Sequence, residues 1–461
     1  MIAAYRAAVA HALGDGQRFA GLHATADGAL VRAAFVARDG SVHLESVAAE
    51  EGRVPSIIDL VPAAGWDERE AADLYGLGFD GHEPLRPLVN HDLDLAHWTV
   101  PVHGADAYQI AVGPIHAGVI ESGHFRFHVV GDRILHVDAR LFYKHRGLER
   151  AAEGRSQEEG LAYAMRACAG CAVSNSVAYA HACEDALGLL PTAELARVRT
   201  ILLELERTWN HLNDIAAVCA GVGLAAGNTG FAALTEQARR LNATLTGHRF
   251  GFGAIGVGGS TLDVDAGTVA AAREEVSSIA AASRRGWREL RFNASFQDRL
   301  PQIGTVTLED ARSLGAVGPA ARASGLADDV RTASARLAYD GFAAAALARP
   351  VGDARSRLEQ RALELDQCFE LLDGLLDGRI EPAGTEAGAD PGGIGIGRVE
   401  SPRGATLCIV EHAAARIERL RLRTGSYANW PVVAHAAVGE LLPDFPLVNK
   451  SFELCYACAD R

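Results

Sequence analysis

The stretch Cys168-Ala169-Gly170-Cys171 and the later stretch Cys455-Tyr456-Ala457-Cys458 are two Cys-x-x-Cys pairs. Each pair can direct two thiolates at one metal, so both together can supply four sulfurs to one soft-metal site. A zinc ribbon separates its pairs by roughly 15–20 residues, whereas most of this chain lies between the two pairs. A domain must therefore fold to bring them together, which favours a metal buried in a domain core over a stapled finger.

The alternative for each pair is that its spacing arises by chance and its cysteines only pack in the core, because buried free cysteine behaves as a small hydrophobe. Two pairs, one of them near a chain end where residues usually fray, favour metal binding. Eight cysteines in 461 residues, with no secretion signal, do not indicate a disulfide scaffold. The other four lie in apolar contexts and are predicted to fill the core: Cys183, Cys219, Cys368 and Cys408.

Composition sets the class of protein. With 49% hydrophobic and 22% charged residues, the chain has the balance of a soluble globular protein with room for two or three domains. A net charge of −14 without a basic stripe excludes nucleic acid as the main partner. The short basic run at 416–423 (RIERLRLR) is interpreted as a solvated helix face. Residues 215–234 carry four glycines and predict a buried helix broken by a glycine-rich turn, not a membrane span.

The pattern along the chain predicts an α+β fold. A small α/β module (residues 1–97) has strands at 29–37 and 40–46 and a helical turn at 66–75. A mainly α-helical domain (98–461) follows a linker at 91–102 and begins with a small β-sheet at 108–137. Helices are predicted at 156–190, 192–219 with Thr192 as N-cap, 232–245, 266–288 and 325–347. A loop is predicted at 381–397 and a strand at 405–411.

Several motifs occur in a fixed order. They are residues 113–127 (GPIHAGVIESGHFRF), 144–149 (KHRGLE), 166–171 (RACAGC), 400–404 (ESPRG) and 444–461 (DFPLVNKSFELCYACADR). In this order they resemble the large subunit of group 4, membrane-associated nickel-iron hydrogenases, the formate hydrogenlyase type among them. The same core builds the quinone-site large subunit of respiratory complex I. Residues 66–70 (WDERE) and 81–86 (GHEPLR) resemble the small companion subunit of complex I, here fused in front.

The resemblance implies a catalytic subunit that interconverts H2 with protons and electrons at a Ni-Fe centre whose iron carries diatomic ligands. By resemblance, Cys171 and Cys458 bridge the two metals, while Cys168 and Cys455 are terminal on nickel. The N-terminal module is expected to dock partners and to carry no catalytic group, so its deletion would leave metal content intact.

Arg403 resembles the guanidinium that lies above the open coordination position, where its donors can orient bound species; the alternative is a surface arginine in a turn. Glu453 is expected to hold Arg403 in place. Glu121 and His124 are candidates for proton transfer, beside the alternatives of a surface carboxylate and a structural histidine. Two further residues are placed at the cofactor by the resemblance, Asn175 and Ser451.

Asn175 stands where the family often has a histidine that donates to a bridging sulfur, and its amide can still donate but cannot relay a proton. The order Ala169-Gly170 also reverses the usual Cys-Gly-x-Cys motif. Related enzymes place a glutamate at Glu149 against a C-terminal histidine, with Mg²⁺ near both. Here Arg461 is expected to fold back, pair with Glu149 and fill the cation position. The last residue coincides with the cleavage point of maturation proteases, so the sequence is either a processed form or one that needs no cleavable tail.

No spare cysteine set remains for iron–sulfur clusters, so these are expected only in partner subunits. The implied partners are an iron–sulfur small subunit, a ferredoxin-like electron-transfer subunit and membrane-arm subunits, at the cytoplasmic face of the cell membrane, where the chain is peripheral. The alternative is a complex I-like quinone-site subunit of an NADH:quinone oxidoreductase-related complex without hydrogenase activity. That branch generally lacks the four thiolates, so the cysteines favour the hydrogenase. A zinc-stabilised interaction module is disfavoured by the separation of the pairs.

Overall fold

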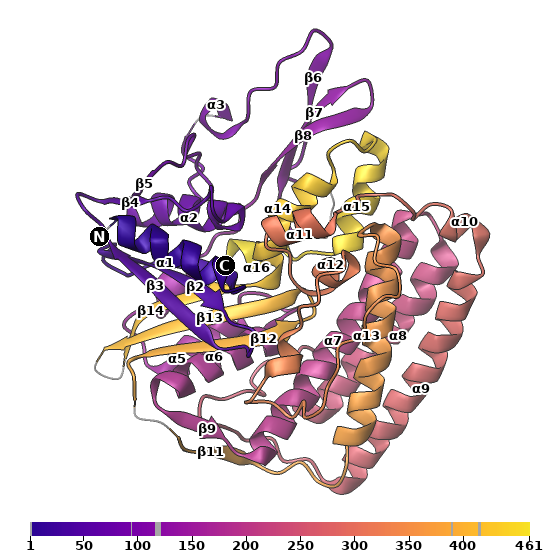
Figure 1. Ribbon diagram of the computed structural model, residues 1–461. Coiled ribbons are helices and arrows are strands. Elements are labelled where there is room, and N and C mark those ends of the chain that lie inside the picture. Colours follow the sequence, from indigo (N-terminus) through magenta and orange to yellow (C-terminus); the bar gives the residue numbers. More distant parts are fainter. Residues whose placement is uncertain (1, 94, 116–120, 389–390, 414–415) are drawn as a thin grey trace.

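Two antiparallel sheets form the layered half of the molecule in the computed structural model, which describes residues 2–461 except 94, 116–120, 389–390 and 414–415 (Figure 1). The first sheet has the order β1 (Arg18–Ala24), β2 (Leu30–Val36), β3 (Val42–Ala48). It shares an apolar core with α1 (Ile2–Gly14) and α2 (Gly65–Tyr75). The strands and the helix predicted in the first hundred residues are confirmed.

The second sheet consists of β12 (Ile394–Ser401), β13 (Gly404–Ala413) and β14 (Arg416–Arg423). One face packs on the N-terminal sheet through Ala34, Leu407 and Ile409. The other face lies on α6 (Ala172–Ala186) so closely that a Cβ at Gly395 or Gly397 would come within 1.9 Å of a backbone carbonyl of α6. Glycine is therefore the residue that permits this contact.

Two sequence predictions around this sheet are wrong. Residues 416–423 are a strand and not a solvated helix face, and the arginines at alternate positions, Arg419, Arg421 and Arg423, are buried. Residues 381–397 are not a continuous loop, because they contain β11 (Ala383–Ala387) and the start of β12. The helical domain thus holds a second sheet besides the predicted one at its start.

The predicted small sheet is confirmed as β6 (Ala107–Val112), β7 (His124–Val130) and β8 (Arg133–Arg140), all antiparallel. The connection from β6 to β7 includes residues 116–120 of the predicted motif, which lie outside the described residues. Smaller pairings join β4 (Arg53–Pro55) to β5 (Gly78–Asp80), and β10 (Gly259–Ser260) to β11 and β9 (Leu189–Pro191).

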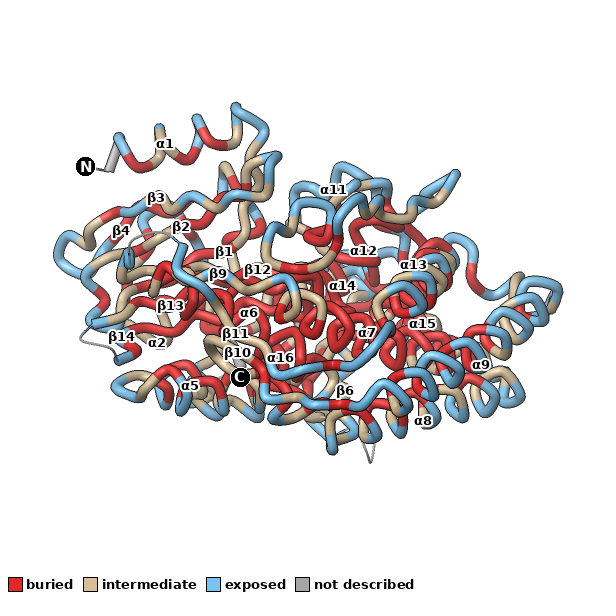
Figure 2. Tube along the Cα trace, turned by 90° about the horizontal axis from the view of Figure 1, so that it is seen from below, coloured by how far each residue is buried: buried red, intermediate tan, exposed pale blue. Residues whose placement is uncertain are grey.

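Four long helices pack side by side in the other half of the molecule (Figure 1): α7 (Ala193–Gly221), α8 (Ala225–Thr246), α9 (Ala266–Arg291) and α13 (Ala354–Leu375). Thr192 caps α7 by accepting a hydrogen bond from the Leu195 amide, as predicted. The predicted glycine-rich break is confirmed between α7 and α8. The tube view shows α6 and α7 as buried elements between the exposed outer helices (Figure 2).

The helix predicted at 325–347 is wrong, since the only helical part of that segment is the 3-10 helix η2 (Val330–Ala333). Arg331 and Tyr339 both reach Glu204 of α7, and an extended path lets the segment make both contacts. The sequence missed α13 because its buried face carries Arg357, Arg361 and Glu364, which weaken the apolar periodicity. The helix predicted at 156–190 is divided into α5 (Gln157–Met165) and α6, with Cys168 and Cys171 in the turn between them.

The C-terminal segment forms α14 (Gly425–Ala436), η3 (Leu442–Asp444), α15 (Phe445–Phe452) and α16 (Tyr456–Asp460). The remaining short helices are η1 (Pro62–Ala64), α3 (Leu95–Trp98), α4 (Leu148–Ala152), α10 (Ala294–Gln297), α11 (Leu308–Ser313) and α12 (Gly318–Ala323). The α+β class is confirmed, and Cys183, Cys219, Cys368 and Cys408 are buried as predicted. The boundary between residues 97 and 98 stays a prediction.

Candidate metal centre

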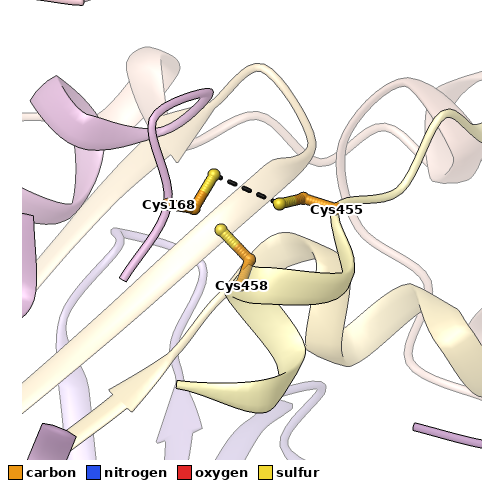
Figure 3. Close-up of side chains that lie close together, drawn as sticks. All are labelled: Cys168, Cys455 and Cys458. Atoms are coloured by element: carbon orange, nitrogen blue, oxygen red, sulfur yellow. Dashed lines mark hydrogen bonds between the residues drawn. The ribbon is translucent and has the colours of Figure 1, made fainter. Parts of the chain in front are cut away.

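The two Cys-x-x-Cys pairs meet where the turn before α6 faces the start of α16 (Figure 3). The Sγ atoms of Cys168 and Cys455 are 3.2 Å apart, and those of Cys168, Cys455 and Cys458 all lie within 4.8 Å of one another. Cys171 belongs to the same buried cluster and shares thiol hydrogen bonds with Cys168 and Cys458. The four cysteines therefore lie in one cluster, as predicted, and their role as metal ligands stays a prediction.

The four thiols are crowded and mostly buried, and all are free. Hydrogen bonds from the thiols of Cys168 and Cys458 lower the pKa of Cys171 to about 6. The pKa of Cys455 is raised to about 12 by its hydrogen bond with the Cys168 thiol and by burial. The four thiols are thus linked by hydrogen bonds through the protons that they share. A soft cation would replace those protons, so the donor set fits a thiolate-bound nickel-iron centre.

Glu121 reaches the site from the segment before β7. Its Oε2 accepts a hydrogen bond from the Ala457 amide at 2.7 Å and lies 3.9 Å from the Sγ of Cys455. Burial, followed by the nearby Cys455, raises the pKa of Glu121. The carboxylate is therefore placed to exchange a proton with a site thiol.

His124, at the start of β7, is held by contacts with the β6–β7 region and with Trp98. Its Nδ1 is 3.2 Å from the Gly113 carbonyl and its ring packs against Trp98. Burial lowers the pKa of His124, which favours the neutral ring. These contacts hold the ring by Nδ1, while Nε2 is buried without a hydrogen-bond partner among the described residues, and a role of His124 in proton transfer stays a prediction.

Arg403 lies in the turn between β12 and β13 and is buried. It donates through Nη1 to the carboxylate of Asp214 and through Nη2 to Oδ1 of Asn210 at 3.2 Å. Burial disfavours its charge, but Asp214 more than offsets this, so the pKa of Arg403 is raised and the group stays cationic. The alternative of a surface arginine is excluded.

Glu453 is the half-buried C-cap of α15 and has a left-handed backbone, φ 48°. Burial, and then the charge of Asp214, raise its pKa to about 7, while Arg403 acts in the opposite direction. The hydrogen bonds of Arg403 go to Asp214 and Asn210, so Glu453 influences Arg403 through its charge. Sequence reasoning missed both hydrogen-bonding partners, although the polar run from 204 to 214 in an otherwise apolar helix is the signal that could have found them.

Asn175 and Ser451 differ in how they are bound. Among the described residues, neither side-chain amide atom of Asn175 has a hydrogen-bond partner, and the residue sits one helical turn after Cys171. Its donor is thus available near the cysteine turn. Ser451 accepts from Nε of Arg357 at 2.9 Å and donates to the Val448 carbonyl at 2.6 Å, so it stabilises α15 behind the site.

Arg461 is folded back and 2% exposed, and its Nη1 lies 2.6 Å from Oε1 of Glu149, as the sequence predicts. Its Nη2 also lies 2.8 Å from both carboxylate oxygens of Glu70, a residue of the N-terminal module. Arg421 joins the same cluster through Glu70 at 2.7 Å and Asp67 at 2.8 Å. The buried strand β14 is therefore the link between the module and the C-terminal helix.

Comparison with known proteins agrees with this geometry. Residues 223–391 match the family described as respiratory-chain NADH dehydrogenase, 49 Kd subunit, and residues 27–101 match the corresponding 30 Kd subunit. Formate hydrogenlyase subunit 5 of Escherichia coli K12 is 30% identical over 448 residues, which cover 90% of this chain and 78% of that protein. Hydrogenase-4 component G of the same organism is also 30% identical, over 90% of this chain and 77% of its own length. The chain belongs to the group 4 hydrogenase large-subunit family.

The similarity extends beyond hydrogenases. An NADH-quinone oxidoreductase protein of Aquifex aeolicus is 25% identical over 377 residues, 70% of this chain and 64% of that protein. A solved chain of the membrane-bound sulfane sulfur reductase, an archaeal respiratory membrane complex, superposes with a TM-score of 0.71 at 25% identity over 77% of this chain and 99% of its own. Within the described residues, no helix has both the length and the apolar character that a membrane span requires.

Proposed function

We propose that this chain is the catalytic large subunit of a nickel-iron hydrogenase, with Cys168, Cys171, Cys455 and Cys458 as the metal ligands. The observation that carries the proposal is the meeting of four free thiols at one buried site from the two ends of the helical domain. The similarity to two hydrogenase proteins over 90% of the chain supports it. The bound nickel and iron would supply an open coordination position at which H2 is split heterolytically.

The side chains around the sulfurs have distinct tasks. Arg403, fixed by Asp214, presents a positive charge and N–H donors to the site. Because the side chain is buried, these donors do not have to compete with water. Glu121 accepts a proton released at Cys455, since its carboxylate lies 3.9 Å from that sulfur and its pKa is raised. The Ala457 amide keeps the carboxylate oriented during that exchange.

Electrons must enter and leave through other proteins. Among the described residues, the four remaining cysteines take part in no further group of three or more metal-binding side chains, so we assign iron–sulfur clusters to an iron–sulfur small subunit and a ferredoxin-like subunit. The name of one relative, the membrane-bound hydrogenase subunit alpha of Pyrococcus furiosus, supports association with a membrane complex. We propose membrane-arm subunits as partners and a peripheral place at the cytoplasmic face of the cell membrane.

A second candidate is a quinone-site subunit without hydrogenase activity. The similarity to NADH-quinone oxidoreductase proteins favours it. The cluster of four thiols favours the hydrogenase instead, because quinone binding needs no thiolate-bound metal.

Elemental analysis separates the candidates. The chain would be produced together with hydrogenase maturation factors, and nickel and iron per chain would be measured with H2-dependent dye reduction. Serine at any of the four site cysteines should abolish nickel binding. Cys368→Ser is the matched control, since a hydroxyl there can donate to Glu204 as the thiol does. Stoichiometric zinc without nickel would favour the zinc module, and a metal-free chain that binds quinone would favour the second candidate.

A further inference from the structure

Helix α7 presents three polar side chains to the metal centre at intervals of one turn: Glu206, Asn210 and Asp214. Residues four apart lie on one face of a helix. At one end, Glu206 accepts from the amides of Val173 at 2.7 Å and Ser174 at 3.0 Å, so it caps the helix that begins directly after Cys171. At the other end, Asp214 accepts from Arg403. The two halves of the site are therefore built on one helix face.

Asn210, in the middle of this face, contacts both halves with one amide group. Its Nδ2 donates to the Gly170 carbonyl at 2.8 Å, in the turn that carries Cys168 and Cys171. Its Oδ1 accepts from Nη2 of Arg403 at 3.2 Å. Nδ2 also donates to the Glu206 carbonyl of the preceding turn at 2.8 Å, which fixes the plane of the amide. The side chain is buried, so losing one of these hydrogen-bond partners costs free energy, because water does not readily take the partner's place.

We propose that Asn210 is a positioning residue that sets the cysteine turn at a fixed distance and angle from the Arg403 guanidinium. Because the side-chain amide of Asn210 is planar and rigid, a shift of the Gly170 peptide is passed to Arg403 by the two hydrogen bonds of that amide. Such hydrogen bonds behind the ligands orient the ligand atoms, and their loss typically costs about 10–100-fold in metal affinity or activity. The catalytic meaning of this link rests on the proposed function, whereas its effect on the cysteine turn does not.

Two substitutions separate the contacts of Asn210. Asn210→Asp keeps an acceptor for Arg403 and removes the donor to Gly170, while Asn210→Leu removes both at similar volume. The matched controls are Asn242→Asp and Asn242→Leu, because Asn242 is a buried asparagine of α8 whose Nδ2 donates to the Arg249 carbonyl at 3.3 Å.

The first measurement uses the full-length, metal-free chain. The rate of alkylation by iodoacetamide is followed by mass spectrometry at Cys168 and Cys171, with Cys183 of α6 as an internal reference. Both Asn210 variants should raise the rate at Cys168 and Cys171 relative to Cys183, because the cysteine turn loses its hydrogen bond to α7, and the Asn242 variants should not. Rates in the Asn210 variants equal to those of their Asn242 counterparts would overturn the proposal.

The second measurement uses the metal-loaded complex and the infrared bands of the diatomic ligands on iron. Asn210→Leu should change the band positions at full nickel content, and Asn242→Leu should leave them at the wild-type values. Unchanged bands in Asn210→Leu would overturn the link to Arg403. A wild-type chain without nickel and iron would instead refute the proposed function, and the alkylation rates would still decide the role of Asn210.

Discussion

The Nη2 of Arg461 lies 2.8 Å from both carboxylate oxygens of Glu70, although 391 positions separate the two residues in the chain. Burial raises the pKa of Glu70, but the charges of Arg421 and Arg461 more than offset this, so its pKa is held well below the usual value. Glu70 belongs to the N-terminal module, and Arg461 directly follows the helix that carries Cys458. The module is therefore tied to the metal-binding helix by a buried ion pair.

The first prediction concerns this ion pair. Glu70→Gln keeps the shape of the side chain but removes one of the carboxylates that balance the buried arginines Arg461 and Arg421, which should lower the free energy of unfolding by about 3 kcal/mol. The control is Asp59→Asn, which removes an exposed pair with Arg6 and should cost about 1 kcal/mol or less. Chemical denaturation measures both. An equal loss of unfolding free energy in the two variants would show that the buried pair stabilises the fold no more than the exposed pair does.

The same contact changes the expectation for deletion of residues 1–97. From the sequence, deletion would leave metal content intact. Because Glu70 holds Arg461 behind α16, we now expect the shortened chain to lose nickel faster than the full chain during dialysis against a chelator. Equal rates of loss would restore the original expectation.

The second prediction concerns Glu149. Arg461→Ala and Glu149→Gln each remove the 2.6 Å ion pair and unbalance the buried cluster of charges around it, so both should reduce metal occupancy or stability. Arg416→Ala is the control, because Arg416 is exposed on β14 and donates to the Gly154 carbonyl. Nickel per chain and the unfolding midpoint are the readouts. If either site variant behaves like Arg416→Ala, the pair is not needed at the metal centre.

The third prediction concerns pH and the contact between the two sheets. Burial raises the pKa of Glu411, but hydrogen bonds from His23 and Arg32 of the N-terminal module outweigh it and lower that pKa to about 2. A depressed carboxyl pKa adds stability above the unfolded value of 4.5, and this contribution is lost as pH falls from about 4.5 through 2. Burial also lowers the pKa of His23, so protonation of that ring acts in the same direction.

The measurement is acid unfolding of the wild type and of Glu411→Gln. The wild type should be the more stable of the two near neutral pH, and the difference should shrink between about pH 4.5 and 2. A difference that stays constant over this range would show that Glu411 does not titrate with the predicted depression.

The parts of the molecule that sequence could predict are those in which local pattern and packing agree. Thr192 indicates the start of α7, and the apolar run at 29–37 indicates β2, because both signals depend on neighbours in the chain. The convergence of the cysteines was predictable because one metal explains two distant pairs. Residues 416–423 were misread because their arginines face acidic groups from distant parts of the chain, such as Glu149, 270 positions before Arg419, which no local pattern contains.

The sequence predicted the cysteines of the candidate site but not the residues that hold the site in place. Asn210 and Asp214 act only because Gly170 and Arg403 arrive beside them from other elements. In the sequence they are polar residues of one long helix, where a solvated face is the simpler interpretation. Glu70 was missed for the same reason, since its partner lies at the other end of the chain.

The last prediction concerns Glu121. Glutamine there can still accept the hydrogen bond from the Ala457 amide, so Glu121→Gln should keep the fold and the nickel while it loses the capacity to take a proton from Cys455. General acid–base groups typically contribute about 10²–10⁴-fold, so we expect H2-dependent dye reduction and H/D exchange to fall by at least about 10²-fold. Glu158→Gln, on the exposed side of α5, is the control and should leave both rates unchanged. If Glu121→Gln keeps the wild-type exchange rates at full nickel content, the proton is accepted by a group other than Glu121.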